Sequence, residues 1–217
     1  EPLSVLRCPA QQGGVAFDEA DRIAVVGQQL VTVFDMSTGT TILELAREAR
    51  VRCVALSKEG NMVVFGGFDK KVVLLDVHSG ANISALPGAD DTVRSVHLSA
   101  DARLIALGCE KRGKGCAILY ELPACELRNL WQRDKVVWCV RLSPDASLLA
   151  ACGYDMQLVI HSTSAPYDTL HSVKYPIFGG PAFIWSCDFS ADSQRLAVGC
   201  WNSRAYLYDV KYRPGVV

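Results

Sequence analysis

The chain has 217 residues, half of them hydrophobic, and a formal net charge of −1 at neutral pH. A chain of this length can bury a substantial core. No apolar run is close to the length of a membrane-spanning helix, which needs about 18 residues. The nearly balanced charge excludes a global field that would draw the protein to nucleic acid or anionic lipid. The sequence begins at Glu1 with neither Met nor a signal-peptide pattern, which suggests a segment of a longer chain.

One short phrase recurs five times along the chain, and a small polar residue, called here the anchor, fixes its register: Asp18, Ser57, Ser99, Ser143 and Ser190. In four copies an acid stands two positions after the anchor: Glu59, Asp101, Asp145 and Asp192. In all five copies a small residue stands nine positions after it: Gly27, Gly66, Gly108, Cys152 and Gly199. The anchors are 39, 42, 44 and 47 residues apart. A period near forty, composed of short strands, is typical of propeller blades.

Each copy predicts four strands, called A to D in chain order. The A strands are short apolar stretches such as 51–56, and the B strands are continuous apolar runs such as 62–65, typical of strands covered on both faces. The link between A and B has the composition of a tight turn. The C strands end in an apolar residue that is usually followed by an acid, and the D strands are amphipathic, which suits an outer edge. Residues 44–50 have high helix propensity, and only the repeat register predicts that they begin in a strand.

The number of cysteines, nine, is odd, and several of them fall on shared repeat positions rather than in a disulfide-like pattern. Cys53 and Cys139 occupy one position, and Cys109 and Cys200 occupy another. We interpret them as small core residues with free thiols. Free thiols favour a reducing compartment, the cytoplasm or the nucleus.

These features resemble the WD-repeat (beta-transducin-like) propeller family. The resemblance rests on Val-x-x-Val-x-Leu-Ser-x-Asp/Glu-Gly/Ala in strand A and its turn, on Asp69 or Asp155 in the B–C turn, and on the x-Asp pair that closes strand C. It covers residues 14–209 and implies an all-β fold, a beta-propeller of four-stranded antiparallel blades. The family's Gly-His dipeptide and Trp-Asp pair are missing from every copy. Its hydrogen-bonded tetrad of His, Asp, Ser/Thr and Trp is therefore incomplete, which predicts blades held less rigidly than is usual in the family.

The resemblance implies a single propeller domain over 1–217, with blades near 14–45, 51–86, 93–130, 136–174 and 184–210. The fifth copy lacks a D strand of its own. Residues 1–8 have the pattern of one and are predicted to be a blade-closing outer strand, either of the fifth blade or of a preceding blade. Rings of this family usually have seven blades, so the five copies predict either a complete small ring or a fragment of a seven-bladed ring.

No catalytic, metal or cofactor site is predicted. The four histidines lie far apart in the sequence: His78, His97, His161 and His171. None has a zinc-ligand spacing to a Cys or an acid, and we interpret His97 as an ordinary side chain of a strand A. Cys109 and Cys116 flank a longer third B–C turn, 110–115, and are interpreted as unrelated thiols. An enzymatic propeller is kept as a less favoured alternative.

The family's geometry places the D–A and B–C loops on one face of the ring, the top face, where two repeat positions gather aromatic and arginine residues. Five residues before the anchor stand Gly13, Arg52, Arg94, Trp138 and Trp185. Eleven residues after it stand Gln29, Phe68, Glu110, Tyr154 and Trp201. Trp, Tyr and Arg dominate the energetics of protein interfaces. The predicted partner-binding residues are therefore Arg52, Phe68, Arg94, Trp138, Tyr154, Trp185 and Trp201. The alternative is that the Trp rings pack between blades.

The sequence thus predicts a non-catalytic scaffold that binds a peptide or loop of a protein partner on the top face, without a membrane partner. Aromatic rings would supply buried area, and Arg52 and Arg94 would select acidic or phosphorylated groups. The alternative partner is nucleic acid, bound by two small basic clusters: Arg47, Arg50 and Arg52 with Lys111, Arg112 and Lys114. A steep loss of affinity with salt would distinguish this alternative.

Overall fold

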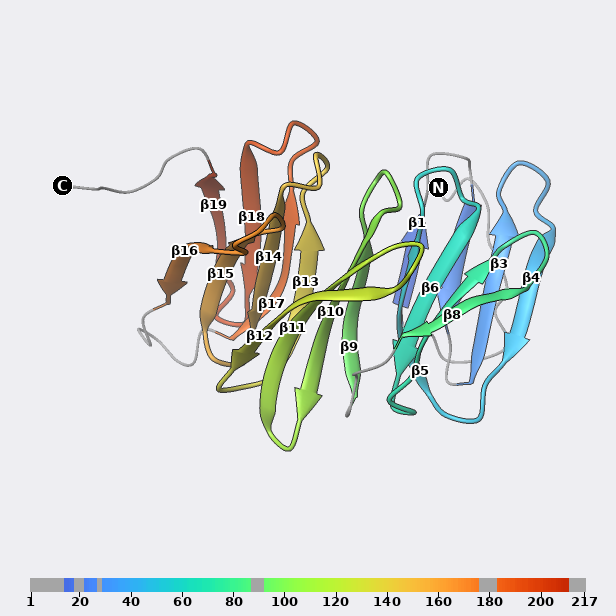
Figure 1. Ribbon diagram of the computed structural model, residues 1–217, viewed down its shortest axis with the longest axis horizontal. Helices are drawn as coiled ribbons and strands as arrows, with labels where there is room; N and C mark the ends of the chain where they lie inside the picture. Colours follow the sequence, from blue (N-terminus) through green and yellow to red (C-terminus); the bar gives the residue numbers. More distant parts are fainter. Residues whose placement is uncertain (1–13, 18–21, 27–28, 87–91, 176–182, 211–217) are drawn as a thin grey trace. The chain divides into compact units, whose positions relative to one another are not determined.

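The structure is a computed structural model that describes residues 14–17, 22–26, 29–86, 92–175 and 183–210. These residues form nineteen strands in five antiparallel sheets and no helix, as the all-β prediction requires (Figure 1). Within these ranges, accordingly, no helix has the length and hydropathy to cross a membrane. The chain divides into two compact units, Glu1–Val93 and Arg94–Val217, which are described separately.

The first unit contains two four-stranded sheets whose strands lie in chain order. The strands of its first sheet are β1 (Gly14–Phe17), β2 (Arg22–Val26), β3 (Leu30–Asp35) and β4 (Thr41–Ala46). Those of its second sheet are β5 (Val51–Leu56), β6 (Met62–Gly67), β7 (Val72–Asp76) and β8 (Asn82–Leu86). The two sheets share one core, in which Val31, Val33 and Val63 are fully buried. Chains of antiparallel hairpins in this order are the blades predicted for the propeller.

The second unit contains three sheets, again with strands in chain order. Its first sheet comprises β9 (Val93–Leu98), which begins at the last residue of the first unit, β10 (Leu104–Lys111), β11 (Lys114–Glu121) and β12 (Glu126–Arg133). Its second comprises β13 (Val137–Leu142), β14 (Leu148–Gly153), β15 (Gln157–Ser162) and β16 (Thr169–Lys174). Its third comprises β17 (Ile184–Phe189), β18 (Arg195–Cys200) and β19 (Ala205–Asp209). Residues 1–8, predicted to add a closing strand, lie outside the described residues.

The anchor serine ties the turn between the first two strands of a sheet to the strand that follows. The Oγ of Ser143 donates to Asp145 Oδ1 at 2.5 Å and accepts from the backbone N–H of Leu148 at 3.0 Å. The same two bonds form at Ser99 and Ser190. At Ser57 the acceptor is Asn61 instead of the acid two positions on. The recurring Ser-x-Asp therefore exists because it satisfies the polar groups of a tight turn.

Two local predictions are decided by strand pairing. Residues 44–46 belong to β4, paired with β3, although the segment 44–50 favours a helix, since tertiary pairing overrides weak helix propensity.

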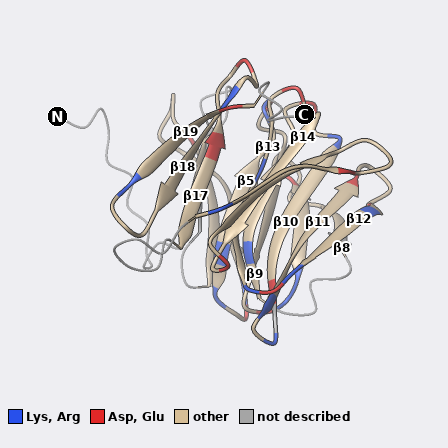
Figure 2. Ribbon diagram, turned by 90° about the vertical axis from the view of Figure 1, so that its left-hand side faces the viewer, with Lys and Arg blue, Asp and Glu red and all other residues tan. Residues whose placement is uncertain are grey.

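The third B–C turn is not a long loop, because β10 and β11 extend until Lys111 pairs with Lys114. Only Arg112 and Gly113 form the turn, both with positive φ. Figure 2 shows the basic tip of this hairpin in blue at the bottom of the view.

Side chains of β9 accept backbone hydrogen bonds from β13 of the next sheet. The N–H of Val140 donates to Ser95 Oγ, and the N–H of Leu142 donates to His97 Nδ1, both at 3.1 Å. Burial, together with the positive charge of Arg141, lowers the pKa of His97 to about 4. A neutral imidazole is needed here, because a protonated Nδ1 has no lone pair to accept this bond. His97 is therefore a structural residue of a strand A, with the added role of joining two sheets.

We expect acid to destabilise the second unit through His97. The folded-state pKa lies below the ordinary value of 6.5, so the unfolded chain binds more protons between these two values. The free energy of unfolding is then complete above the unfolded pKa and falls as the pH drops toward 4, by about 3 kcal/mol for this shift. Burial and Arg133 lower the pKa of His161 to about 4 as well, which adds a loss of the same sign.

Urea unfolding followed by circular dichroism across this pH range measures the effect. His97→Asn should flatten the pH dependence, because the amide oxygen can accept the Leu142 N–H but does not titrate. His78→Asn, at an exposed histidine of the first unit, is the control. Equal pH dependence of the parent and His97→Asn would contradict the assignment.

Candidate interaction surface

The two tryptophans that stand five residues before their anchors project from β-bulges. Strand register shifts between Val137 and Cys139 in the β13–β14 pair, and between Ile184 and Ser186 in the β17–β18 pair. Trp138 and Trp185 are thus the extra residues of two equivalent bulges. A third bulge lies at Arg52 in the first unit. Because a bulge redirects a side chain and interrupts pairing, these positions are suited to presenting a ring beyond the sheet.

The position eleven residues after the anchor is held beside the bulge by one backbone hydrogen bond. The N–H of Tyr154 donates to the carbonyl of Val136 at 3.0 Å, and the N–H of Trp201 donates to that of Phe183 at 2.8 Å. The N–H of Phe68 makes the same bond in the first unit. The bond joins the end of the second strand to the start of the first. Side chains at the two repeat positions are therefore neighbours.

Five rings from the second unit form a continuous chain, called here the aromatic platform: Phe183, Tyr154, Trp138, Trp185 and Trp201. Phe183 and Tyr154 stack with ring centroids 4.0 Å apart, and Tyr154 lies 5.8 Å from Trp138. Trp138 and Trp185 are 3.8 Å apart, and Trp185 lies 5.4 Å from Trp201. The platform spans two neighbouring sheets, since Trp138 comes from β13 and Trp185 from β17 (Figure 1).

The platform combines packing between sheets with exposure to solvent. Trp138 and Phe183 are partly buried beneath their neighbours. Trp185 and Tyr154 are each 41% exposed, and Trp201 is 62% exposed. Inter-blade packing, the alternative considered for these tryptophans, thus describes the Trp138–Trp185 contact, but it leaves most of the Trp201 side chain in water.

The other predicted binding residues lie outside the platform. Arg52 and Phe68 belong to the first unit, where Arg52 is half-buried and Phe68 is 42% exposed. Arg94, in β9, forms an ion pair with Glu110, to which its Nε donates at 3.0 Å. Glu110 occupies the same repeat position as Tyr154 and Trp201. The charge of Arg94 is therefore already matched within its own sheet.

Two arginine–aspartate pairs, neither of which was predicted, occupy equivalent positions in the repeat. Arg133 and Asp155 form a buried pair, with 2.7 Å between Arg133 Nη2 and Asp155 Oδ2. Arg47 and Asp69 form the same pair in the first unit. Each arginine stands ten residues before its anchor, and each aspartate twelve residues after it. The family's Asp is thus tied by Arg instead of His, and this fixed spacing was the signal available in the sequence.

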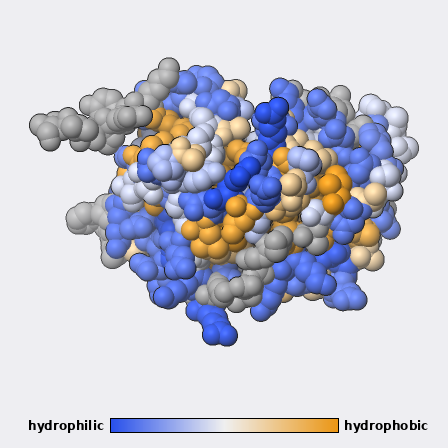
Figure 3. Space-filling view, viewed as in Figure 1, coloured by the Kyte–Doolittle hydropathy of each residue, from blue (hydrophilic) through white to orange (hydrophobic). Residues whose placement is uncertain are grey.

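Apolar side chains are also exposed outside the platform, among them Val15, Phe17, Leu127 and Leu207. Figure 3 shows one face of the molecule, where apolar side chains, in orange, lie between hydrophilic ones. Exposed apolar residues are common on proteins. The platform is distinguished by five aromatic rings that contact one another in series.

Three segments match the family model described as WD domain, G-beta repeat: residues 39–76, 126–162 and 173–209. Together they make up just over half of the chain. The first segment starts just before the fourth strand of a sheet and the other two at or within one, and each ends with the third strand of the next sheet. Each therefore contains both repeat positions from which the interaction surface was predicted.

One relative found in a comparison with curated proteins is "Transcription factor unc-37" of Caenorhabditis elegans. It is 20% identical to this chain over 237 residues. The match covers 90% of this chain but 38% of the relative. The chain thus spans little more than a third of the length of that protein.

Proposed function

Because the chain belongs to the WD domain, G-beta repeat family, whose repeats indicate a protein-interaction scaffold, we propose that it binds a peptide or loop of a partner protein on the aromatic platform. The predicted resemblance to this family is confirmed, as is the all-β architecture, in which four of the five described sheets have four strands. Domains of this family are generally scaffolds without catalysis, and the proposed role requires none.

The observation that carries the proposal is the continuous chain of rings with a partly buried base and an exposed end. Trp138 and Phe183 are held by neighbouring rings, so Trp185, Tyr154 and Trp201 are presented in fixed positions. Rigid aromatic side chains offer a large contact area and lose little conformational entropy when a partner covers them. Such residues, set in a well-packed cluster, are typical of interface hot spots.

The charged residues at the same repeat positions give the proposed partner a chemical character. Arg52 occupies in the first unit the bulge position that Trp138 and Trp185 occupy in the second. We assign to Arg52 and Arg94 a preference for acidic or phosphorylated groups, because guanidinium binds carboxylate and phosphate with paired hydrogen bonds. An acidic group at Arg94 would share the guanidinium with Glu110.

The compartment proposed for this interaction is the nucleus or the cytoplasm. The relative from Caenorhabditis elegans is named a transcription factor, which favours the nucleus. Among the described residues, eight cysteines are outside any disulfide and five of these are buried, which suits either reducing compartment.

Affinity capture from a cell extract, followed by a binding measurement with the captured partner, tests the proposal. Trp201→Ala should weaken binding by about 30-fold or more, because a hot-spot residue contributes about 2 kcal/mol or more. Trp185→Ala should act in the same direction. Both substitutions leave the strand hydrogen bonds intact, so circular dichroism spectra should match that of the parent.

Leu127→Ala is the matched control, because it removes an apolar side chain that is 55% exposed outside the platform. It should leave the affinity unchanged. If Trp201→Ala and Leu127→Ala retain the same partners with the same affinity, the platform is packing between sheets and the proposal fails. Binding that weakens steeply with salt and survives Trp201→Ala would instead support the nucleic-acid alternative.

A further inference from the structure

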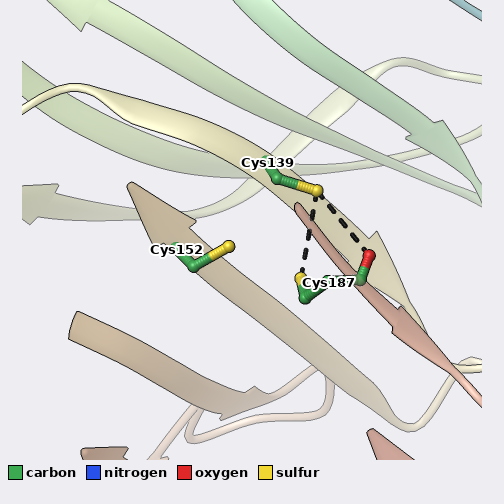
Figure 4. Close-up of side chains that lie close together, drawn as sticks. All are labelled: Cys139, Cys152 and Cys187. Carbon is green, nitrogen blue, oxygen red and sulfur yellow. Dashed lines mark hydrogen bonds between the residues drawn. The ribbon is translucent and has the colours of Figure 1, made fainter. Parts of the chain in front are cut away.

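Three buried cysteines converge in the core of the second unit. Cys139 lies in β13, Cys152 in β14 and Cys187 in β17, and all three sulfur atoms lie within 4.8 Å of one another. The Sγ atoms of Cys139 and Cys187 are 3.9 Å apart. Figure 4 shows the three side chains on separate strands, with their sulfur atoms close together. Nothing in the proposed partner binding uses them.

The repeat itself shows that two of these thiols depart from the residue used elsewhere in the chain. Nine residues after the anchor, the four other copies have Gly27, Gly66, Gly108 and Gly199, where this copy has Cys152. Three residues before the anchor, the four other copies have Val15, Val54, Val96 and Val140, where the fifth copy has Cys187. The two departures meet at one place in the fold.

Packing alone does not require thiols at this place. In the preceding pair of sheets the equivalent neighbours are Gly108 and Val140, and a Cβ on Gly108 would approach Val140 Cγ1 to 3.3 Å. Glycine facing valine therefore fills the same space there. Cysteine facing cysteine occupies a similar total volume but brings two sulfur atoms together beside Cys139.

The geometry points to a three-sulfur site for a soft metal ion, and the ion that it fits is Cu(I). Sulfur ligands about 2.3 Å from a metal in a trigonal arrangement are about 4 Å apart, which agrees with the 3.9 Å between Cys139 and Cys187. Thiolates select soft ions such as Cu(I) and zinc. Structural zinc takes four ligands, and among the described residues this cluster offers three. Cu(I) accepts three.

The charge of the site is partly offset by its surroundings. Each thiol that binds as a thiolate releases its proton to solvent, so Cu(I) on three thiolates leaves two negative charges. Arg141 lies two residues after Cys139, on the same face of β13, and its guanidinium supplies one positive charge. Its Nε also lies 3.8 Å from Asp188 Oδ1, so the site shares this charge with an exposed carboxylate. The remaining neighbours in this core cluster are largely apolar and exclude water and competing ligands.

Anaerobic titration of the reduced chain with Cu(I), supplied as its acetonitrile complex against a coloured Cu(I) chelator, tests the site. The expected result is one tightly held equivalent of Cu(I) with sulfur-only coordination in X-ray absorption. The double variant Cys152→Gly/Cys187→Val replaces both thiols by the residues that the other copies use. It should keep the fold and bind Cu(I) about 100-fold or more weakly.

Cys53→Ser is the matched control, because Cys53 is the equivalent of Cys139 in the first unit and serine occupies that position in two other copies. It should bind Cu(I) like the parent. The assignment is overturned if the parent takes up no tight equivalent, or if the double variant retains it while its melting temperature shows that it is folded. Tighter binding of Zn²⁺ than of Cu(I) at the same thiols would also overturn it.

Discussion

Asp155→Asn is expected to lower the free energy of unfolding by about 3–5 kcal/mol, because it leaves the charge of Arg133 buried without its partner. The side chains of Arg133 and Asp155 are 6% and 10% exposed. Arg133 Nε donates to Asp155 Oδ2 at 2.8 Å, and its Nη2 donates to the Gln157 carbonyl at 3.1 Å. A guanidinium held this way cannot turn out to water without breaking the start of β15. Urea unfolding followed by circular dichroism measures the loss.

The equivalent pair in the first unit provides the comparison. Arg47 and Asp69 are 19% and 18% exposed, so water can solvate the arginine when its partner is neutralised. Asp69→Asn should therefore cost clearly less than Asp155→Asn. The double variant Arg133→Met/Asp155→Leu should recover most of the loss, since an apolar pair of similar volume removes the buried charge. Equal losses at both aspartates would refute this dependence on burial.

Gly153→Ala is expected to destabilise the second unit by about 3 kcal/mol or more. A Cβ at Gly153 would lie 2.0 Å from the carbonyl oxygen of Val136, far inside van der Waals contact. The same carbonyl accepts the N–H of Tyr154, so any shift that relieves the clash also displaces a platform ring. The substitution should therefore reduce both the melting temperature and the affinity for the proposed partner.

Gly199→Ala is the matched control within the same unit. A Cβ there would meet the side-chain oxygen of Ser186 at 3.4 Å, an ordinary contact, and alanine lowers the entropy of the unfolded chain. We expect a change of about 0.5 kcal/mol or less. Should Gly199→Ala cost as much as Gly153→Ala, the close approach to Val136 would not be the cause.

Much of the fold could be predicted from the sequence because equivalent residues recur at fixed distances from the anchor in every copy of the repeat. The anchor serine, the acid after it and the apolar runs each reflect one local requirement, a satisfied turn or a covered strand. The start of residues 44–50 shows why the register was needed, since helix propensity alone predicts the wrong element. The extent of β10 and β11 was missed because pairing continued through residues whose composition suggested a loop.

The sequence indicated the repeat positions of the proposed interaction surface but not the geometry of their side chains. Trp138 and Trp185 were recognised as equivalent, but the bulges that project them depend on strand register, which the sequence does not reveal. Arg133 and Asp155 are 22 residues apart in sequence. Their pairing depends on how the D–A loop that follows Arg133 approaches the B–C turn that contains Asp155. The convergence of Cys152 with Cys187 was missed for the same reason, since it arises between neighbouring sheets.

The division of the chain into two units has a consequence for spectroscopy. All four Trp and all seven Tyr residues of the sequence lie in the second unit, and the aromatic residues of the first unit are phenylalanines alone. Intrinsic fluorescence and absorbance near 280 nm therefore report on residues 94–217 and are blind to residues 1–93. A difference between the fluorescence transition and the circular dichroism transition would reveal directly whether the first unit unfolds with the second or independently of it.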